Sequence, residues 1–424
     1  MNYRLASLVS VILALTVSPA WSAPLTLKEC ISQAVVNNPF LKNAAWDSKI
    51  AQENVRLASA AYFPKIDAQT GYSMQLEPQA VIIGGRTTET QEADFGFAGL
   101  SASYTIYDFG RRDSRKRQSE AVSQASSRTF ESQKSDVTLR VIETYFSILE
   151  SGKLIIAAEE EVALVDEHRR VAKVLFEEGV VTRNDLLQAE VRLAAARQKL
   201  LVAKNRRENF WLLLNFLIGS KPDNRAELDE KTVMAEGAAP TTDSQLQLDA
   251  RNDIIALRHG AEARELEVKE SKGNFFPEIY SRLALDYVQN AKVREQAIMS
   301  ATIGLKINLF DGYASTAARE KAIKNSSKSL DTLRLAEEQA RLEINTARND
   351  VAVAKERISV TEAAIRQSEE NLRINRERYQ ERVGTATEVM DAQTLVTQSK
   401  TDYQRAFYDH QTAIARLLWA QGQL

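Results

Sequence analysis

Proline is absent from two very long stretches of this chain, and this absence limits the folds it can adopt. The eight prolines stand at 19, 24, 39, 64, 78, 222, 240 and 277. A proline inside a helix costs about 3 kcal/mol, because it removes a backbone hydrogen bond and clashes with the preceding turn. The stretches 79–221 and 278–424 therefore permit helices far longer than those of an ordinary globular domain.

An apolar residue recurs every seven positions in the second stretch. The repeat comprises Ile344, Val351, Ile358, Ile365, Leu372 and Tyr379, and small or polar residues stand three positions after the first five. The first half repeats it 203 residues earlier, with Arg169 as an interruption, at Val141, Ile148, Ile155, Val162 and Phe176. Such a repeat indicates packed, coiling helices. About 65 residues of helix would extend ~100 Å, so we expect a rod.

A second duplicated feature follows each of these repeats. The phrase FEEGVVTRNDLLQAE at 176–190 returns as YQERVGTATEVMDAQ at 379–393, again 203 residues later. Each phrase predicts a tight turn, or tip, between two helices, at about 177–184 and 380–387. The chain thus contains an internal two-fold repeat.

The residue types in these phrases fit helix ends. Gly179 is typical of the position after a helix, where glycine adopts a left-handed conformation at little cost. Thr182 with Asp185, and Thr385 with Glu388, have the spacing of a capping box that opens a helix.

Two other patches alternate between apolar and polar residues and predict β-hairpins, at about 65–107 and 278–309 with loops at 77–92 and 289–296. Strands of about eleven residues with one apolar face suit a membrane barrel, although two hairpins on a soluble body are an alternative. Aromatic residues cluster at the strand ends nearest the predicted helices, as in an interfacial girdle: Tyr62, Phe63, Tyr104, Tyr107, Phe275, Phe276, Phe310 and Tyr313. Four strands cannot close a barrel, since the smallest have about eight, so a membrane-spanning form must be an oligomer.

The N-terminal segment has the pattern of a cleaved signal peptide. Arg4 precedes the apolar run LVSVILALTV, and Ala20 and Ser22 suit the −3 and −1 positions of a cleavage site. The expected organisation is a signal peptide at 1–22, a first repeat at 23–218, a connector at 219–246 and a second repeat at 247–424. Each repeat reads as helix, β-hairpin, long helix, tip and helix. After residue 22 no apolar run reaches the ~18–20 residues of a membrane helix.

Composition argues against several classes of function. A formal net charge of −2 leaves no basic surface for nucleic acid. The three histidines are scattered, and no phosphate-binding glycine loop or nucleophile–base cluster is present, so we expect no enzyme, no cofactor and no metal. The single cysteine, Cys30, cannot form an intrachain disulfide and is expected to be a small buried helix residue. A periplasmic adaptor, or another coiled-coil interaction protein of an export system, is the alternative, but it would contain one helical hairpin flanked by small β-domains.

The chain resembles the TolC-like outer membrane efflux family. The residues that carry the resemblance are LTLKECISQAVVNNPFL at 25–41, AAYFPKI at 60–66, GNFFPEI at 273–279, YDFGRR, FDGYAS and the two tip phrases. Their order and constant spacing cover almost the whole chain after residue 22.

The resemblance implies a mainly α fold with membrane β: a homotrimer with a twelve-stranded outer-membrane β-barrel, four strands per chain, continued by a long α-helical coiled-coil barrel in the periplasm. It further implies an exit duct that spans outer membrane lipid and works with a periplasmic adaptor and an inner-membrane pump of the RND, ABC or MFS type. Such a duct exports small molecules or polypeptides.

The resemblance also suggests roles for tip residues. Tyr379 and Asp185 fall on a network that closes the periplasmic entrance, and Glu388 and Asp391 fall on two acidic positions facing the bore. A ring of such carboxylates is expected to raise some of their pKa values by mutual repulsion. The tip turns implied to dock the adaptor are Gly179, Val180, Thr182, Val383, Gly384 and Thr385.

The second tip departs from the family pattern. Arg382 stands where the tip glycine is usual, and Gly384 stands where a basic residue locks the entrance in the best-known member. The acids also have a simpler interpretation, because Asp185 and Glu388 would cap their helices in any protein.

Overall fold

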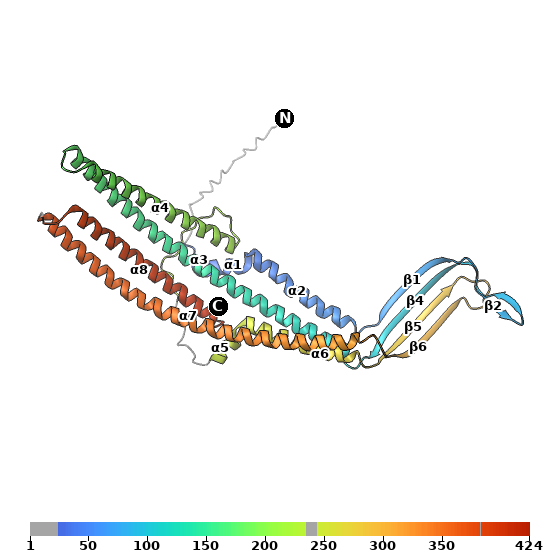
Figure 1. Ribbon diagram of the computed structural model, residues 1–424. Helices are drawn as coiled ribbons and strands as arrows, with labels where there is room; N and C mark the ends of the chain where they lie inside the picture. Colours follow the sequence, from blue (N-terminus) through green and yellow to red (C-terminus); the bar gives the residue numbers. More distant parts are fainter. Residues whose placement is uncertain (1–23, 235–243, 382) are drawn as a thin grey trace, which may run out of the picture.

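The computed structural model describes residues 24–234, 244–381 and 383–424, which form an elongated body of helices with a small sheet at one end (Figure 1). The predicted signal peptide lies outside the described residues, as does the part of the predicted connector at 235–243. Within the described ranges, no helix is both long enough and apolar enough to cross a membrane.

Four helices belong to the first half: α1 (Leu27–Asn37), α2 (Pro39–Ala60), α3 (Arg111–Glu177) and α4 (Arg183–Ile218). The break between α1 and α2 is encoded locally. The Asn38 side-chain oxygen accepts hydrogen bonds from the N–H groups of Phe40 and Leu41 at 2.9 and 3.2 Å. Pro39 occupies the first helical position, where its missing N–H has no intrahelical partner to lose.

The second half repeats this order with α5 (Ser244–Ala250), α6 (Asn252–Gly273), α7 (Ala314–Gln380) and α8 (Ala386–Ala420). Both α3 and α7 contain 67 residues, which corresponds to ~100 Å of helix. The expectation of two very long helices is therefore confirmed.

Two positions of the seven-residue repeat of α7 are buried against α8, as expected for packed helices. Ile344 and Leu372 are 3% and 7% exposed, and Leu372 packs against Ala392 and Val396 of α8. Small or polar residues three positions further on are also buried, among them Ala347, Thr361 and Ser368. Small side chains at these positions let the two helices approach closely.

The same joint is built twice where the second helix of each tip hairpin ends. Asn38 Nδ2 donates to the carbonyl of Leu217 at 2.8 Å near the end of α4. In the second half Arg251 Nη1 donates to the carbonyl of Ala420 at 3.3 Å at the end of α8. A glycine with positive φ follows each helix, Gly219 at 68° and Gly422 at 71°, two residues after each accepting carbonyl.

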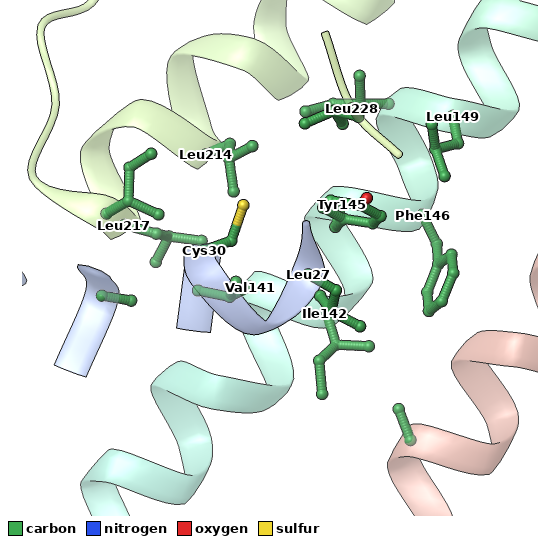
Figure 2. Close-up of a cluster of buried hydrophobic side chains, with 14 of the residues drawn as sticks. Leu27, Cys30, Val141, Ile142, Tyr145, Phe146, Leu149, Leu214, Leu217 and Leu228 are labelled. Atoms are coloured by element: carbon green, nitrogen blue, oxygen red, sulfur yellow. The ribbon is translucent and has the colours of Figure 1, made fainter. Parts of the chain in front are cut away.

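The largest buried cluster lies where α1, α3 and α4 meet (Figure 2). Tyr145 of α3 is fully buried there, and its hydroxyl lies 2.9 Å from the carbonyl of Asp229 and 3.2 Å from that of Leu25. Cys30 belongs to the same cluster as a buried free cysteine, which confirms its expected role. Burial raises the pKa of its thiol to about 12, so the thiol stays protonated.

The four long strands form one antiparallel sheet in the order β1 (Lys65–Met74), β4 (Asp94–Tyr107), β5 (Glu278–Val288) and β6 (Ala297–Lys306). The two halves of the chain join at the β4–β5 pair, whose register is interrupted by a bulge between Thr105 and Tyr107. Strands β1 and β6 are the two edges.

One face of this sheet is apolar and exposed. Residues that share it by register include Ile66, Met74, Leu100, Leu283, Leu285, Met299, Ile303 and Leu305, each of which is at least 47% exposed. Side chains on the opposite face are mainly polar or charged.

Two sequence expectations for the sheet end are wrong. The predicted loop 77–92 contains a small hairpin, β2 (Ala80–Ile83) paired with β3 (Arg86–Glu89). Gly84 and Gly85 both have positive φ at its turn, and a Gly-Gly pair between short strands is a hairpin signal.

The last strand is also shorter than the predicted limit of residue 309, because β6 ends at Lys306. The Asp311 carboxylate accepts hydrogen bonds from Asn308 Nδ2 and the Ser315 N–H, each at 3.0 Å. These bonds turn the chain toward α7.

The duplicated joint predicts a difference between two glycines of similar φ. Gly219 (φ 68°) would place a Cβ atom 2.8 Å from Asn37 Cβ, whereas nothing lies within 4 Å of a Cβ at Gly179 (φ 73°). Both changes to alanine cost about 1–2 kcal/mol of backbone strain, and Gly219→Ala adds about 1–3 kcal/mol of overlap. We therefore expect Gly219→Ala to lower the thermal unfolding midpoint of the detergent-solubilised protein more than Gly179→Ala. Equal midpoints would show that the joint tolerates a side chain.

Candidate functional site

The first tip joins α3 to α4 by a turn that glycine makes possible. Gly179 adopts a left-handed conformation, and the Val180 N–H donates to the carbonyl of Leu175 at 2.8 Å. This bond satisfies a carbonyl that the end of a helix otherwise leaves without a partner. Val180 is 68% exposed at the tip.

A complete capping box opens α4. The Thr182 N–H and hydroxyl donate to Asp185 Oδ2 at 2.8 and 2.7 Å, and the Asp185 N–H lies 3.4 Å from Thr182 Oγ1. The Thr182 side chain, together with its N–H, holds the pKa of the Asp185 carboxyl below its usual value. The predicted cap is therefore confirmed.

The second tip joins α7 to α8 with a different turn. The N–H groups of Val383 and Gly384 both donate to the carbonyl of Arg378, at 2.9 and 3.0 Å. A Cβ at Gly384 would lie 3.2 Å from both Arg378 Cβ and Glu388 Oε2. Gly384 thus lets the turn pack closely against Arg378 and Glu388, whereas Gly179 lets the backbone adopt a left-handed conformation. Arg382 lies outside the described residues.

A second capping box opens α8. The Thr385 N–H donates to Glu388 Oε2 at 2.8 Å, and the Glu388 N–H donates to Thr385 Oγ1 at 3.2 Å. Glu388 Oε1 also lies 4.0 Å from Arg378 Nη2. The Thr385 N–H, assisted by the charge of Arg378, holds the pKa of the Glu388 carboxyl below its usual value. This lowering arises within one chain, and the expected rise by mutual repulsion in a ring of three copies stays a prediction.

Asp391 differs from Glu388 although both stand at the start of α8. It is exposed between the buried Met390 and Ala392. The Asp391 carboxylate forms no hydrogen bond or ion pair with another described residue. Its carboxylate is therefore available to solvent and to neighbouring molecules.

The structure divides the four predicted entrance residues between the two tips. Tyr379, Glu388 and Asp391 lie at the second tip, and Tyr379 is 49% exposed in the last turn of α7. Asp185 lies at the first tip, and the two tips stand apart (Figure 1). Among the described contacts none joins Asp185 to Tyr379.

A groove between the two tip hairpins was not anticipated from the sequence. It has a volume of about 610 Å³ and is lined by α3, α4 and α8, including Ala157, Glu161, Gln198, Thr397 and Arg405. The small residues Ala157, Ala158 and Ala195 on facing helices are the signal that could have indicated it. Within the described ranges no group of three or more His, Cys, Asp or Glu side chains could hold a metal ion.

The two capping boxes predict a pH dependence of the tips. Both carboxyl pKa values are lowered by folding, so the stability they contribute is present above their ordinary values of 3.8 and 4.5 and is lost as pH falls through the folded values. Amide hydrogen exchange, corrected for its intrinsic pH dependence, should show the first turns of α4 and α8 losing protection in this acid range. Thr182→Ala and Thr385→Ala should each reduce this effect at their own tip only. A pH dependence unchanged by both substitutions would contradict it.

Comparison with known proteins agrees with this architecture. The family model described as "Outer membrane efflux protein" matches residues 30–220 and 244–423. The alkaline protease secretion protein AprF of Pseudomonas aeruginosa is 22% identical over 92% of this chain and 83% of its own length. The outer membrane protein TolC of Vibrio cholerae is 22% identical over 76% of this chain and 73% of its own length.

A solved structure has the same fold. The Campylobacter jejuni CmeC outer membrane channel superposes with a TM-score of 0.83 at 17% identity, covering 100% of this chain and 94% of that one. The alternative of a periplasmic adaptor is set aside, because the family model covers both repeats and describes an efflux protein rather than an adaptor or an enzyme class. The chain belongs to the outer membrane efflux protein family and is a TolC-like export channel of the outer membrane.

Proposed function

We propose that three copies of this chain form one exit duct, which receives cargo from an inner-membrane pump through a periplasmic adaptor and releases it outside a Gram-negative cell. The observation that carries the proposal is the four-stranded sheet, which has an exposed apolar face and two unpaired edges, β1 and β6.

Unpaired edges explain why one chain is insufficient. The N–H and C=O groups of an edge strand have no water to bond inside a bilayer, and each group left without a partner costs several kcal/mol. If β6 of one copy pairs with β1 of the next, every edge is satisfied. The resemblance to TolC-like channels favours three copies and twelve strands.

The helices at both sides of the chain also have uncovered apolar surfaces. On α2, Trp46, Ile50 and Leu57 are 59%, 57% and 73% exposed, and on α7, Leu335 and Leu342 are 59% and 67% exposed. α2 continues from the β1 side and α7 from the β6 side of the sheet. The same pairing of neighbours that closes the sheet therefore covers these surfaces and continues the barrel as a helical tunnel.

The tips are the proposed docking place for the adaptor. Val180 and Val383 are 68% and 72% exposed at the two turns, and the groove lies further along the hairpins, between α3, α4 and α8. The remaining docking residues are Gly179, Thr182, Gly384 and Thr385. The pump, of the RND, ABC or MFS type, and the adaptor choose the cargo, which is a small toxic molecule or a polypeptide.

The second tip is the proposed gate. Three copies bring Glu388 and Asp391 around the narrowest point of the bore. Tyr379 and Asp185, which lie on different tips of one chain, can meet there only if the tips approach or if neighbouring copies supply the contact.

Shared closure predicts the oligomeric state. Light scattering of the detergent-solubilised protein, with the detergent mass subtracted, should give three times the chain mass. A monomer that stays folded and soluble after removal from the outer membrane would contradict the proposal. Recovery from the soluble periplasm, without heat-modifiable migration in gels, would contradict it as well.

The gate predicts a charge-dependent block. A ring of carboxylates attracts cations and sets ion preference in a pore, so the channel in planar bilayers should prefer cations and be blocked by hexamminecobalt(III) added at the tip side. The double change Glu388→Ala with Asp391→Ala should abolish the block and weaken the cation preference, while the trimer persists.

A purely structural role of these acids predicts the reverse result. The block would then be retained, and the start of α8 would lose protection in hydrogen exchange. Thr385→Ala is the matched control, because it weakens the same cap without removing a charge. A double variant blocked like the wild type would refute the ring.

A further inference from the structure

The face of the sheet opposite the apolar residues carries a row of side chains across all four strands. The register aligns Lys65 of β1 with Ser103 of β4, Ser103 with Arg282 of β5, and Arg282 with Thr302 of β6. A hollow of about 1010 Å³ lies where the strands meet the helices, and it is lined by Lys65, Ser103 and other residues of the strand and helix ends. In a closed barrel the apolar face is turned to the lipid, so this polar face is turned to the bore.

Most charges on this face are neutralised within the chain. Lys65 Nζ lies 3.1 Å from Asp67 Oδ1. Glu278 accepts hydrogen bonds from Arg111 at 2.7 Å and from Thr105 at 2.8 Å, and Lys306 stands directly opposite Glu278 in the register. Asp67 thus offsets Lys65, whereas Glu278 is shared by Arg111 and Lys306, which leaves one positive charge per chain in this group.

Of Lys65, Arg282 and Lys306 on this face, Arg282 alone has no acidic residue directly opposite it or two positions along its strand. Its side chain is exposed, and it forms no hydrogen bond or ion pair with any residue that the structure describes. Its row neighbours Ser103 and Thr302 are small, and so is Ala284, the next residue of β5 on this face. The guanidinium group is thus free of steric obstruction on the bore side.

An acidic counterpart lies further along the same strand. Asp286 is four residues beyond Arg282, about 13 Å away along a strand. Its Oδ1 atom would lie 3.0 Å from a Cβ at Gly99. The Asp286 side chain therefore lies close to the backbone of β4, at a position where glycine has no side chain. At this distance the two charges interact weakly across a water-filled bore.

We propose that Arg282 is a specificity-determining residue of the duct: three copies place three guanidinium groups around the bore at the middle of β5, where they attract and briefly bind anionic groups of the passing cargo. This inference rests on the proposed trimeric duct. A guanidinium group binds carboxylates and phosphates through paired hydrogen bonds, so the favoured cargo carries such groups. The exit is then anion-attracting, in contrast to the acidic entrance at the tips.

The test uses the full-length protein in planar bilayers, with inorganic tripolyphosphate added to the side of the loops 77–92 and 289–296. From this side the anion reaches Arg282 without passing the tips. We expect a concentration-dependent block, and Arg282→Glu should raise the half-blocking concentration at least fivefold. Arg282→Lys should retain most of the block. Lys306→Gln is the matched control and should raise the half-blocking concentration less than Arg282→Gln does, because Lys306 stands opposite the carboxylate of Glu278.

The same series is repeated with Glu388→Ala and Asp391→Ala present, so that the tips do not limit the current. Should Arg282→Glu fail to assemble, Arg282→Gln removes the charge with little change of shape. Wild-type block in an assembled, conducting Arg282→Gln or Arg282→Glu channel overturns the inference alone. A trimer that inserts but conducts no current, both with and without the changes Glu388→Ala and Asp391→Ala, overturns the proposed duct and the inference with it.

Discussion

The backbone edges of a four-stranded sheet are the constraint on which the rest of this molecule depends. A soluble protein can leave an edge strand in water, whereas a sheet in a bilayer has no solvent to satisfy it. β1 and β6 are edges of this kind, and the face between them is apolar and exposed. The helices extend this geometry, because α2 leads into the edge strand β1 and the edge strand β6 leads into α7. Closure of the sheet and closure of the tunnel are therefore one assembly event.

The sequence predicted the large elements well, because each rests on a local signal. Missing prolines and the seven-residue repeat predicted α3 and α7, and alternation predicted the long strands. Two features were not predicted. One of them has a local sequence signal, and the other depends on residues that are far apart in the chain. Gly84 and Gly85 indicated the β2–β3 hairpin locally, whereas the groove beside Arg405 requires three helices to be placed first.

The candidate gate shows the same division. The caps at Thr182 and Thr385 could be predicted, because a capping box involves residues only three positions apart. The engagement of Glu388 by Arg378 could not, since it depends on how tightly the turn at Gly384 folds back. The two acids at the start of α8 therefore differ: Glu388 is bound within its own chain, and Asp391 is exposed to its surroundings.

The duplicated joint between the helices has kept its shape and changed its chemistry. In the first half a neutral amide, Asn38, reaches the carbonyl of Leu217. In the second half a buried guanidinium, Arg251, reaches that of Ala420 while it also binds Asp253 and Glu343 at 2.7 Å. The two joints share the position of a donor and a glycine with positive φ beside it, and they differ in charge. Salt is therefore expected to weaken the ion pairs of Arg251 in the second joint, whereas the first joint contains no charge that salt could screen.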